Sequence, residues 1–223
     1  YMTCIGVSTR VLASVLSMHG DDKGLVLPSI IAPYQVIIIP ILNKKTENAM
    51  IQKVEEMKEQ LEAAGIRARV DLNQQKRPGE KYFFYEMKGI PLRIEFGMRD
   101  LEAGNFVLVI RGIEGKQVVK ISDLVSKCKE SLVSYDDALR ERAKAHLKSR
   151  IVDCDSLDAI SEVLKQGGFA RIPYWTMEKE GAEGAEIVHD TCGGEIRGYR
   201  PLEEQPGEGV KCIVTGKPAK YWA

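Results

Sequence analysis

Four charged side chains that lie close together in the sequence are candidates for a binding site: Glu86, Arg93, Arg99 and Asp100. A carboxylate can accept N–H donors on the edge of an unstacked nucleic-acid base, and an arginine can donate to the carbonyl and ring-nitrogen acceptors of a base. In a plainer interpretation, Glu86 is a solvated helix residue, and Arg99 and Asp100 form a surface ion pair worth under about 1 kcal/mol. Residue type alone leaves both interpretations open.

Aromatic and basic residues surround this group. Three consecutive aromatic residues can stack on bases, although we expect at least one to pack in the core: Phe83, Phe84 and Tyr85. Three basic residues are better placed to contact phosphate than bases: Lys76, Arg77 and Lys81.

A second candidate site lies near the N-terminal end, where Ser8 and Arg10 begin a predicted helix. A planar, permanently charged guanidinium suits phosphate binding and stacking over an adenine. Seen alone, however, an arginine in the first helical turn is usually solvated, and Ser8 is most simply a helix N-cap. We expect His19 to shape the following turn with Asp21 and Asp22, and assign it no catalysis.

The overall charge argues against a protein that coats nucleic acid. Lysine plus arginine number 32 and aspartate plus glutamate number 32, so the formal net charge is zero. Non-specific binders gain affinity by displacing phosphate counterions and usually carry a basic excess. We therefore expect no DNA partner, and any RNA must be recognised by a local patch.

Hydropathy and cysteine usage predict a cytoplasmic protein without a membrane partner. The longest apolar run, Val36 to Leu42, is far shorter than the about 20 residues that span a bilayer. The N-terminus has no signal-peptide pattern. The five cysteines are odd in number and never form a CxxC motif, which suits reduced thiols.

The elements that must position the first site form an α/β pattern. Strands and helices alternate, which implies a largely parallel or mixed sheet covered by helices. Predicted strands cover Gln35–Pro40, Arg67–Leu72, Leu92–Phe96, Phe106–Ile110 and Lys116–Ile121, and predicted helices cover 46–64 and Lys81–Met87.

The flanking segments are predicted to belong to other units. One helix and a short buried strand at Leu25–Leu27 cannot bury a core, so the N-terminal segment is interpreted as the end of a larger domain. A long helix from Ser122 to Arg150, with a possible break near Ser134, leads into a small unit. There Ser156 caps a helix, and strands are predicted at Phe169–Trp175, Glu195–Tyr199 and Val210–Val214.

Three stretches together resemble one family. They are GVSTR at 6–10 with HGDDKGLVLP at 19–28 and IAPYQV at 31–36, then KGIPLRIEFGMRDL at 88–101, and finally KC at 211–212 with GKPAKY at 216–221. They resemble motif 3, the anticodon-recognising stretch and the tail domain of class II prolyl-tRNA synthetases of the archaeal/eukaryote-like type. The ordered match covers nearly the whole chain, from motif 3 onward.

The resemblance implies an α/β fold in three parts. Residues 1–33 correspond to the end of the class II catalytic domain, residues 34–135 to a mixed-sheet α/β anticodon-binding domain, and residues 136–223 to a small α+β tail domain. The implied activity is ATP-dependent ligation of proline to tRNA(Pro) through prolyl-adenylate. Class II motifs 1 and 2 are not in this chain, so we expect it to be inactive without an N-terminal portion, through which the family also forms homodimers.

The resemblance also assigns site residues. Arg10 takes the role of the motif 3 arginine that holds ATP, with Mg²⁺ accompanying the nucleotide, and Ser8 lines the ATP and proline pocket. Glu86, Arg93 and Asp100, together with Arg99, resemble positions through which the family recognises the two guanines of proline anticodons. The family often has lysine where Arg99 stands, which keeps the charge but changes the geometry.

Zinc is not expected, although many relatives hold it in the tail domain through cysteines. His189, Cys192 and Cys212 offer three ligands, whereas a structural site normally needs four. We expect apolar packing of aromatic side chains to replace the metal: Trp175, Tyr199 and Tyr221.

Two alternatives remain open. A non-catalytic interaction protein that reuses the anticodon-binding fold would have no class II motifs 1 and 2 upstream. A small α/β domain could instead bind a metabolite at its strand ends, but the chain has no Gly-rich phosphate loop.

Overall fold

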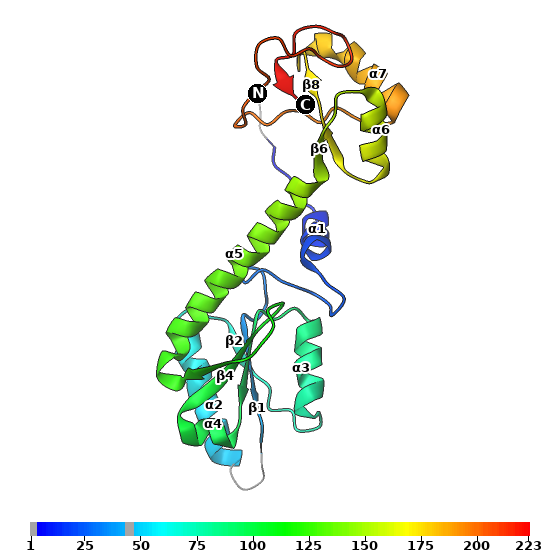
Figure 1. The fold of residues 1–223 in the computed structure, drawn as a ribbon. Helices are drawn as coiled ribbons and strands as arrows, with labels where there is room; N and C mark the ends of the chain where they lie inside the picture. Colours follow the sequence, from blue (N-terminus) through cyan, green and yellow to red (C-terminus); the bar gives the residue numbers. More distant parts are fainter. Residues whose placement is uncertain (1–3, 43–46) are drawn as a thin grey trace. The chain divides into compact units, whose positions relative to one another are not determined.

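The computed structural model describes residues 4–42 and 47–223, which group into two compact units, one ending at Ala143 and the other starting at Lys144 (Figure 1). The division falls within helix α5 (Leu124–Arg150). The three-part division drawn from the sequence stays a prediction.

A five-stranded mixed sheet, with strand order β2-β1-β3-β4-β5, forms the centre of the first unit. The central strand β1 pairs in parallel with β2 and β3, whereas β3, β4 and β5 pair antiparallel. The predicted mixed α/β architecture is confirmed, and the strands are β1 (Val36–Pro40), β2 (Ala68–Val70), β3 (Leu92–Phe96), β4 (Asn105–Ile110) and β5 (Gln117–Lys120).

One face of this sheet packs against α2 (Glu47–Ala63), α4 (Met98–Ala103) and α5. In α2 the apolar side chains recur every three or four residues and are fully buried, as the helical period predicts: Met50, Val54, Met57 and Leu61. The predicted start of α2 at residue 46 lies outside the described residues. A 3-10 turn, η1 (Ile121–Asp123), leads into α5.

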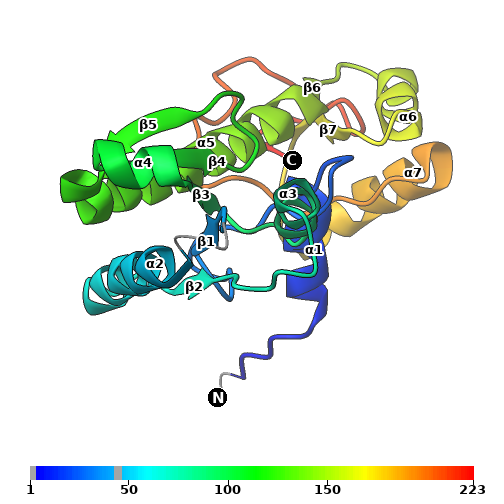
Figure 2. The same ribbon diagram turned by 90° about the horizontal axis from the view of Figure 1, so that it is seen from below.

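The opposite face of the sheet packs against α3 (Pro78–Met87). Figure 2 shows α2 and α3 on different sides of β1. Because successive residues of a strand point to opposite faces, β3 sends Leu92, Ile94 and Phe96 into the core with α2. Arg93 and Glu95 therefore point to the face that α3 covers.

Val26 and Leu27 are buried, but residues 25–27 do not form the predicted strand. The Leu25 N–H donates to the carbonyl of Met87 at 3.0 Å, and the Tyr135 hydroxyl donates to the carbonyl of Leu27 at 2.9 Å. The end of α3 and the Tyr135 side chain thus satisfy backbone N–H and carbonyl groups that would pair with a neighbouring strand in a sheet. The approach is close, since a Cβ on Gly24, where φ is 128°, would lie 2.6 Å from the Met87 carbonyl oxygen.

The N-terminal helix α1 (Arg10–His19) is largely exposed. It begins at Arg10, so its cap position is Thr9, and the prediction that Ser8 caps it is wrong. The Ser8 Oγ accepts only a 3.3 Å bond from the Arg10 N–H. Apolar side chains of this segment are more than half exposed, so it buries no core of its own: Ile5, Val7, Val11, Leu12 and Met18.

The second unit is a small α+β structure. Its helices are α6 (Leu157–Lys165) and α7 (Ala182–Cys192), the latter preceded by the 3-10 turn η2 (Lys179–Gly181). The Ser156 Oγ accepts from the Ala159 N–H at 3.3 Å, which confirms the predicted cap of α6. Two short sheets pair β6 (Ile151–Asp153) with β7 (Phe169–Arg171), and β8 (Pro173–Tyr174) with β9 (Tyr221–Trp222).

Three local predictions are wrong. Residues 195–199 and 210–214 form no strands, and positive φ at Gly198, Gly209 and Gly216 bends the chain into turns around them. Helix α5 is not broken near Ser134, because Tyr135 and neighbouring apolar residues continue its buried stripe. Over the described ranges, no helix is both long enough and apolar enough to cross a membrane.

Candidate functional site

A cavity of about 550 Å³ opens on the face of the sheet that α3 covers. Its wall comes from the C-terminal end of α3, from β3, from the end of β4 with the following turn, and from the turn at residues 21–23. Two of the residues predicted to bind, Glu86 and Arg93, line it together. The structure therefore brings a carboxylate and a guanidinium from separate elements to one hollow.

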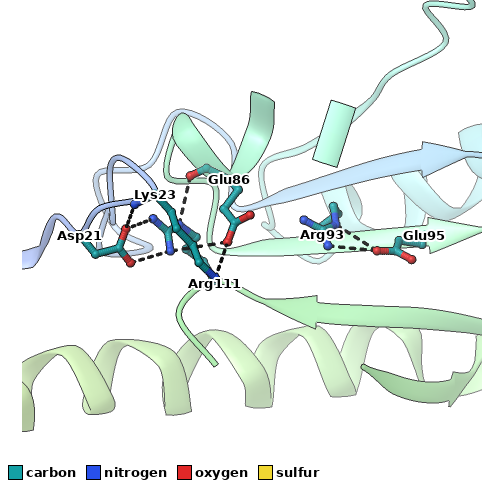
Figure 3. Close-up of polar contacts among 6 residues, drawn as sticks. All are labelled: Asp21, Lys23, Glu86, Arg93, Glu95 and Arg111. Carbon is teal, nitrogen blue, oxygen red and sulfur yellow. Dashed lines mark hydrogen bonds and ion pairs between the residues drawn. The ribbon is translucent and has the colours of Figure 1, made fainter. Parts of the chain in front are cut away.

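Glu86 lies between two cations (Figure 3). Its Oε1 is 3.6 Å from the Nζ of Lys23 and 4.0 Å from Nη1 of Arg111. Its side chain is 23% exposed. The carboxylate thus lies between two positive charges at the edge of the cavity, and part of the Glu86 side chain remains exposed.

Arg111 is a buried cation that the sequence analysis did not single out. It donates from Nη1 and Nη2 to the two carboxylate oxygens of Asp21 at 2.8 and 2.6 Å, and from Nε to the Glu86 carbonyl at 3.1 Å. The Arg111 hydrogen bond, more than any other contact, holds the pKa of Asp21 below its usual value. The sequence signal that could have identified Arg111 is its position between an apolar predicted strand and Gly112.

Arg93 is fixed by a second buried acid that the sequence analysis also missed. Its Nε and Nη2 donate to Oε1 of Glu95 at 3.2 and 3.0 Å, and the Nζ of Lys116 donates to Oε2 of Glu95 at 2.5 Å. The guanidinium lies 4.5 Å from the ring centroid of Tyr82. Positions 93 and 95 share one face of a strand, which was the only sequence signal for this pair.

Asp100 and Arg99 lie beyond the other end of β3. The Asp100 Oδ2 accepts the Gly97 N–H at 2.8 Å and so caps the start of α4. Burial raises the pKa of Tyr82, and the carboxylates of Glu95 and Asp100 raise it further. Arg99 is exposed on α4, and neither residue lines the cavity.

The aromatic residues of α3 divide between core and surface. Tyr85 packs against Ile37 and Ile90, which confirms that at least one of the three lies in the core. Phe83 is 74% exposed, and Phe84 lies edge-on to Tyr85 with the Lys76 Nζ 4.6 Å from its ring centroid.

Lys81 is not a phosphate contact, contrary to the sequence-based expectation. Its side chain is buried, with Nζ donating to the Asp71 carbonyl at 2.9 Å and lying 3.2 Å from Asp71 Oδ1. Lys76 and Arg77 are exposed. Lys81 therefore anchors α3 to the end of β2.

The predicted nucleotide site retains two exposed residues, Ser8 and Arg10. At the other end of the same helix, His19 is buried, and its carbonyl accepts from Nη2 of Arg142 at 2.6 Å. Burial and, second, the charge of Arg142 lower the pKa of His19. This histidine is part of the packing of the N-terminal segment.

The second unit does not present a metal-binding set. The Cys192 Sγ donates to the Leu157 carbonyl at 3.3 Å, and Cys212 is buried in the apolar core. Across the part of the chain that the structure describes, no three His, Cys, Asp or Glu side chains come together as a metal site. The donors present therefore do not fit zinc, while Tyr199 and Tyr221 pack with their ring centroids 4.6 Å apart.

Comparisons with known proteins add independent findings. Residues 35–131 match the model of a family described as "Anticodon binding domain". The proline–tRNA ligase of Methanococcoides burtonii is 40% identical over 220 residues, which are 99% of this chain and 44% of that protein. The corresponding protein of Methanosarcina mazei is 39% identical over 217 residues, or 97% of this chain and 44% of that protein.

A solved structure is similar as well. Giardia lamblia prolyl-tRNA synthetase in complex with prolyl-adenylate is 38% identical with a TM-score of 0.87, and the match covers 96% of this chain and 46% of that one. This chain thus spans less than half of the length of each of these relatives.

Proposed function

We propose that this chain is part of an enzyme that ligates proline to tRNA(Pro). The premise is that residues 35–131 belong to the anticodon-binding domain family and that the whole chain is related to a part of prolyl-tRNA synthetases. This chain supplies recognition of the anticodon, and Arg10 and Ser8 contribute to the ATP and proline site. The observation that carries the proposal is the cavity in which Glu86 and Arg93 meet within the matched domain.

The cavity has the chemistry that a guanine requires. Its volume, about 550 Å³, falls in the range of small-ligand sites. Glu86 would accept the ring and amino N–H donors of the base, and Arg93 would donate to O6 and N7. Adenine presents a ring acceptor where guanine presents a donor, so it would face the Glu86 carboxylate with repulsion. Discrimination of this kind is worth about 1–3 kcal/mol per base.

The second guanine of the anticodon requires a second pair of groups. Asp100 and Arg99 provide a carboxylate and a guanidinium beyond the far end of β3. We assign Glu86 and Arg93 to one base and Asp100 and Arg99 to the other.

The reaction itself would take place around the N-terminal segment. The proline carboxylate attacks the α-phosphorus of ATP and pyrophosphate leaves. A terminal hydroxyl of the tRNA 3′ end then attacks the carbonyl of the prolyl-adenylate, which forms the prolyl ester and releases AMP. Arg10 would hold the nucleotide, which arrives with Mg²⁺, through a charge-assisted contact. The reaction needs residues outside this chain.

The exposed apolar side chains of the first segment support its assignment to a larger domain. Ile5, Val7, Val11 and Leu12 have no core to enter within the described structure. Side chains of this kind gain free energy when they are covered. We therefore divide the chain into the end of a catalytic domain (1–33), an anticodon-binding domain (34–135) and a tail domain (136–223), in a cytoplasmic homodimer.

Two assays of the full-length protein test this function. Proline-dependent ATP–pyrophosphate exchange follows adenylate formation, and charging of a tRNA(Pro) transcript follows the complete reaction. We expect both activities in the wild type and neither in Arg10→Ala. The matched control is Arg197→Ala, which removes an exposed arginine of the second unit. A wild-type protein inactive in both assays contradicts the proposal.

A further inference from the structure

Glu95 is the most enclosed acid at the candidate site, and its position gives it a function distinct from base recognition. We propose that Glu95 is a positioning residue that fixes the Arg93 guanidinium in the orientation required to recognise a guanine. The inference rests on the proposed function, since it presumes that Arg93 contacts the anticodon.

Glu95 cannot contact a base itself. Its side chain is only 7% exposed, and each of its carboxylate oxygens is already occupied by a cation. Oε1 accepts two bonds from Arg93, and Oε2 accepts one from Lys116. Glu95 therefore acts on a ligand in the cavity through the side chains that it holds, and we assign this effect to Arg93, which makes two of the three bonds.

The pattern of bonds leaves one defined edge of Arg93 for a ligand. A guanidinium carries five N–H donors in a rigid planar fork. Glu95 engages the side edge made by Nε and Nη2. The end edge, made by Nη1 and the second hydrogen of Nη2, keeps the paired donors that match O6 and N7 of guanine.

Tyr82 restricts the remaining freedom of Arg93. Its ring centroid lies 4.5 Å from the guanidinium carbon, within the range of a cation–π contact. The carboxylate thus fixes rotation of the guanidinium in its plane, and the ring limits its tilt. Without Glu95 the Tyr82 ring would remain, but the two hydrogen bonds to Oε1 that orient the end edge would be lost.

Lys116 extends this arrangement to the turn between β4 and β5. Its Nζ lies 5.7 Å from the Tyr82 ring centroid while it bonds to Glu95. Two cations at one site repel each other unless a carboxylate lies between them. Glu95 therefore holds both cations of this wall in place.

Variants of the full-length protein test the proposal by charging of three transcripts: natural tRNA(Pro) and two in which one anticodon guanine is replaced by adenine. For Glu95→Gln we expect kcat/KM on the natural transcript to fall roughly tenfold or more, mainly through KM. The preference for one guanine over adenine should shrink with it, while ATP–pyrophosphate exchange stays unchanged. Glu102→Gln, the same change at an exposed position of α4, should behave as wild type.

A double-mutant comparison separates positioning from a general structural effect. Because Glu95 acts through Arg93, the pair Arg93→Ala with Glu95→Gln should charge tRNA no worse than Arg93→Ala alone. Additive losses, or a Glu95→Gln protein with wild-type charging and preference, would overturn the proposal. If Glu95→Gln does not fold, Glu95→Asp is used instead. Its carboxylate is withdrawn by one methylene, so the preference for guanine over adenine should be partly lost. An unchanged preference refutes the positioning role.

The outcomes keep the two claims apart. If Arg93→Ala impairs charging and the Glu95 variants do not, the positioning role fails and the proposed function stands. If the wild-type protein charges the altered transcripts as well as the natural one, anticodon recognition itself fails.

Discussion

Arg111 and Asp21, which are 90 positions apart in the sequence, form a two-bond ion pair, with Nη2 and Nη1 of the arginine 2.6 and 2.8 Å from the two carboxylate oxygens. The Arg111 side chain is 3% exposed, and its Nε also holds the Glu86 carbonyl. The buried Arg111 at the end of β4 therefore binds both the turn after α1 and the end of α3. The geometry of the candidate site depends on these hydrogen bonds of Arg111.

We predict that Asp21→Asn lowers the free energy of unfolding of this chain by about 1–3 kcal/mol, because it removes the carboxylate to which the buried Arg111 guanidinium donates two hydrogen bonds. Asp21 is 35% exposed, so the loss should stay below that of a fully buried pair. Urea unfolding measures it. Asp22→Asn, an exposed acid of the same turn, should change stability by less than about 0.5 kcal/mol. Equal losses in the two variants would argue against the pair.

Glu86→Gln should lower kcat/KM for charging of tRNA(Pro) by roughly 10- to 100-fold, since the amide replaces an anionic acceptor with a group that also carries donors. ATP–pyrophosphate exchange should remain close to wild type, because Glu86 lies in the anticodon-binding domain rather than beside Arg10. Glu102→Gln serves as the control with the same chemistry at an exposed site. A parallel fall in both activities would show that Glu86 acts on the fold or on adenylate formation.

Asp100 has two assignments that different substitutions separate. Asp100→Ala removes the acceptor for the Gly97 N–H and should cost about 1 kcal/mol of stability as well as charging activity. Asp100→Asn keeps an acceptor for that N–H, so stability should be nearly unchanged while charging still falls and adenylate formation stays nearly untouched. Urea unfolding and the two activity assays decide. An Asp100→Asn protein that charges tRNA at the wild-type rate limits Asp100 to its capping role.

The pH dependence of stability should carry a contribution from His19. Burial and then the charge of Arg142 lower the pKa of His19 below its ordinary value, so the unfolded chain takes up a proton first as the pH falls. The stability that neutral His19 provides is present above the unfolded pKa and decreases below it. We expect wild type to lose more unfolding free energy than His19→Gln between about pH 7.5 and about pH 5.5. His146→Gln, an exposed histidine of α5, should follow wild type; parallel curves for all three proteins would contradict the prediction.

Local patterns were sufficient to predict the main elements of the sheet. The β-branched run at Val36–Pro40 and the alternation at Leu92–Phe96 coincide with β1 and β3, and the helical spacing from Met50 to Leu61 identifies α2. In these segments the burial of each side chain follows from the period of its own element. The resemblance to a known family contributed the site residues, which periodicity could not.

Several partners of the site residues could not be predicted, because these pairings join distant parts of the chain. Arg111 finds Asp21 across 90 positions, and Lys116 finds Glu95 across 21 positions. The prediction of short strands at residues 195–199 and 210–214 was wrong for a related reason. Their apolar runs are too short to set a period, and turns at glycines such as Gly198 and Gly216 decide the path of the backbone.

The most direct test of the account is the kcat/KM of the full-length protein for charging tRNA(Pro) transcripts in which each anticodon guanine is replaced in turn. The account predicts a loss of roughly tenfold or more at each of the two positions, and a smaller loss at the position read by Glu86 and Arg93 once Arg93 is changed to alanine. Equal charging of the natural and the replaced transcripts by the wild-type protein would contradict it.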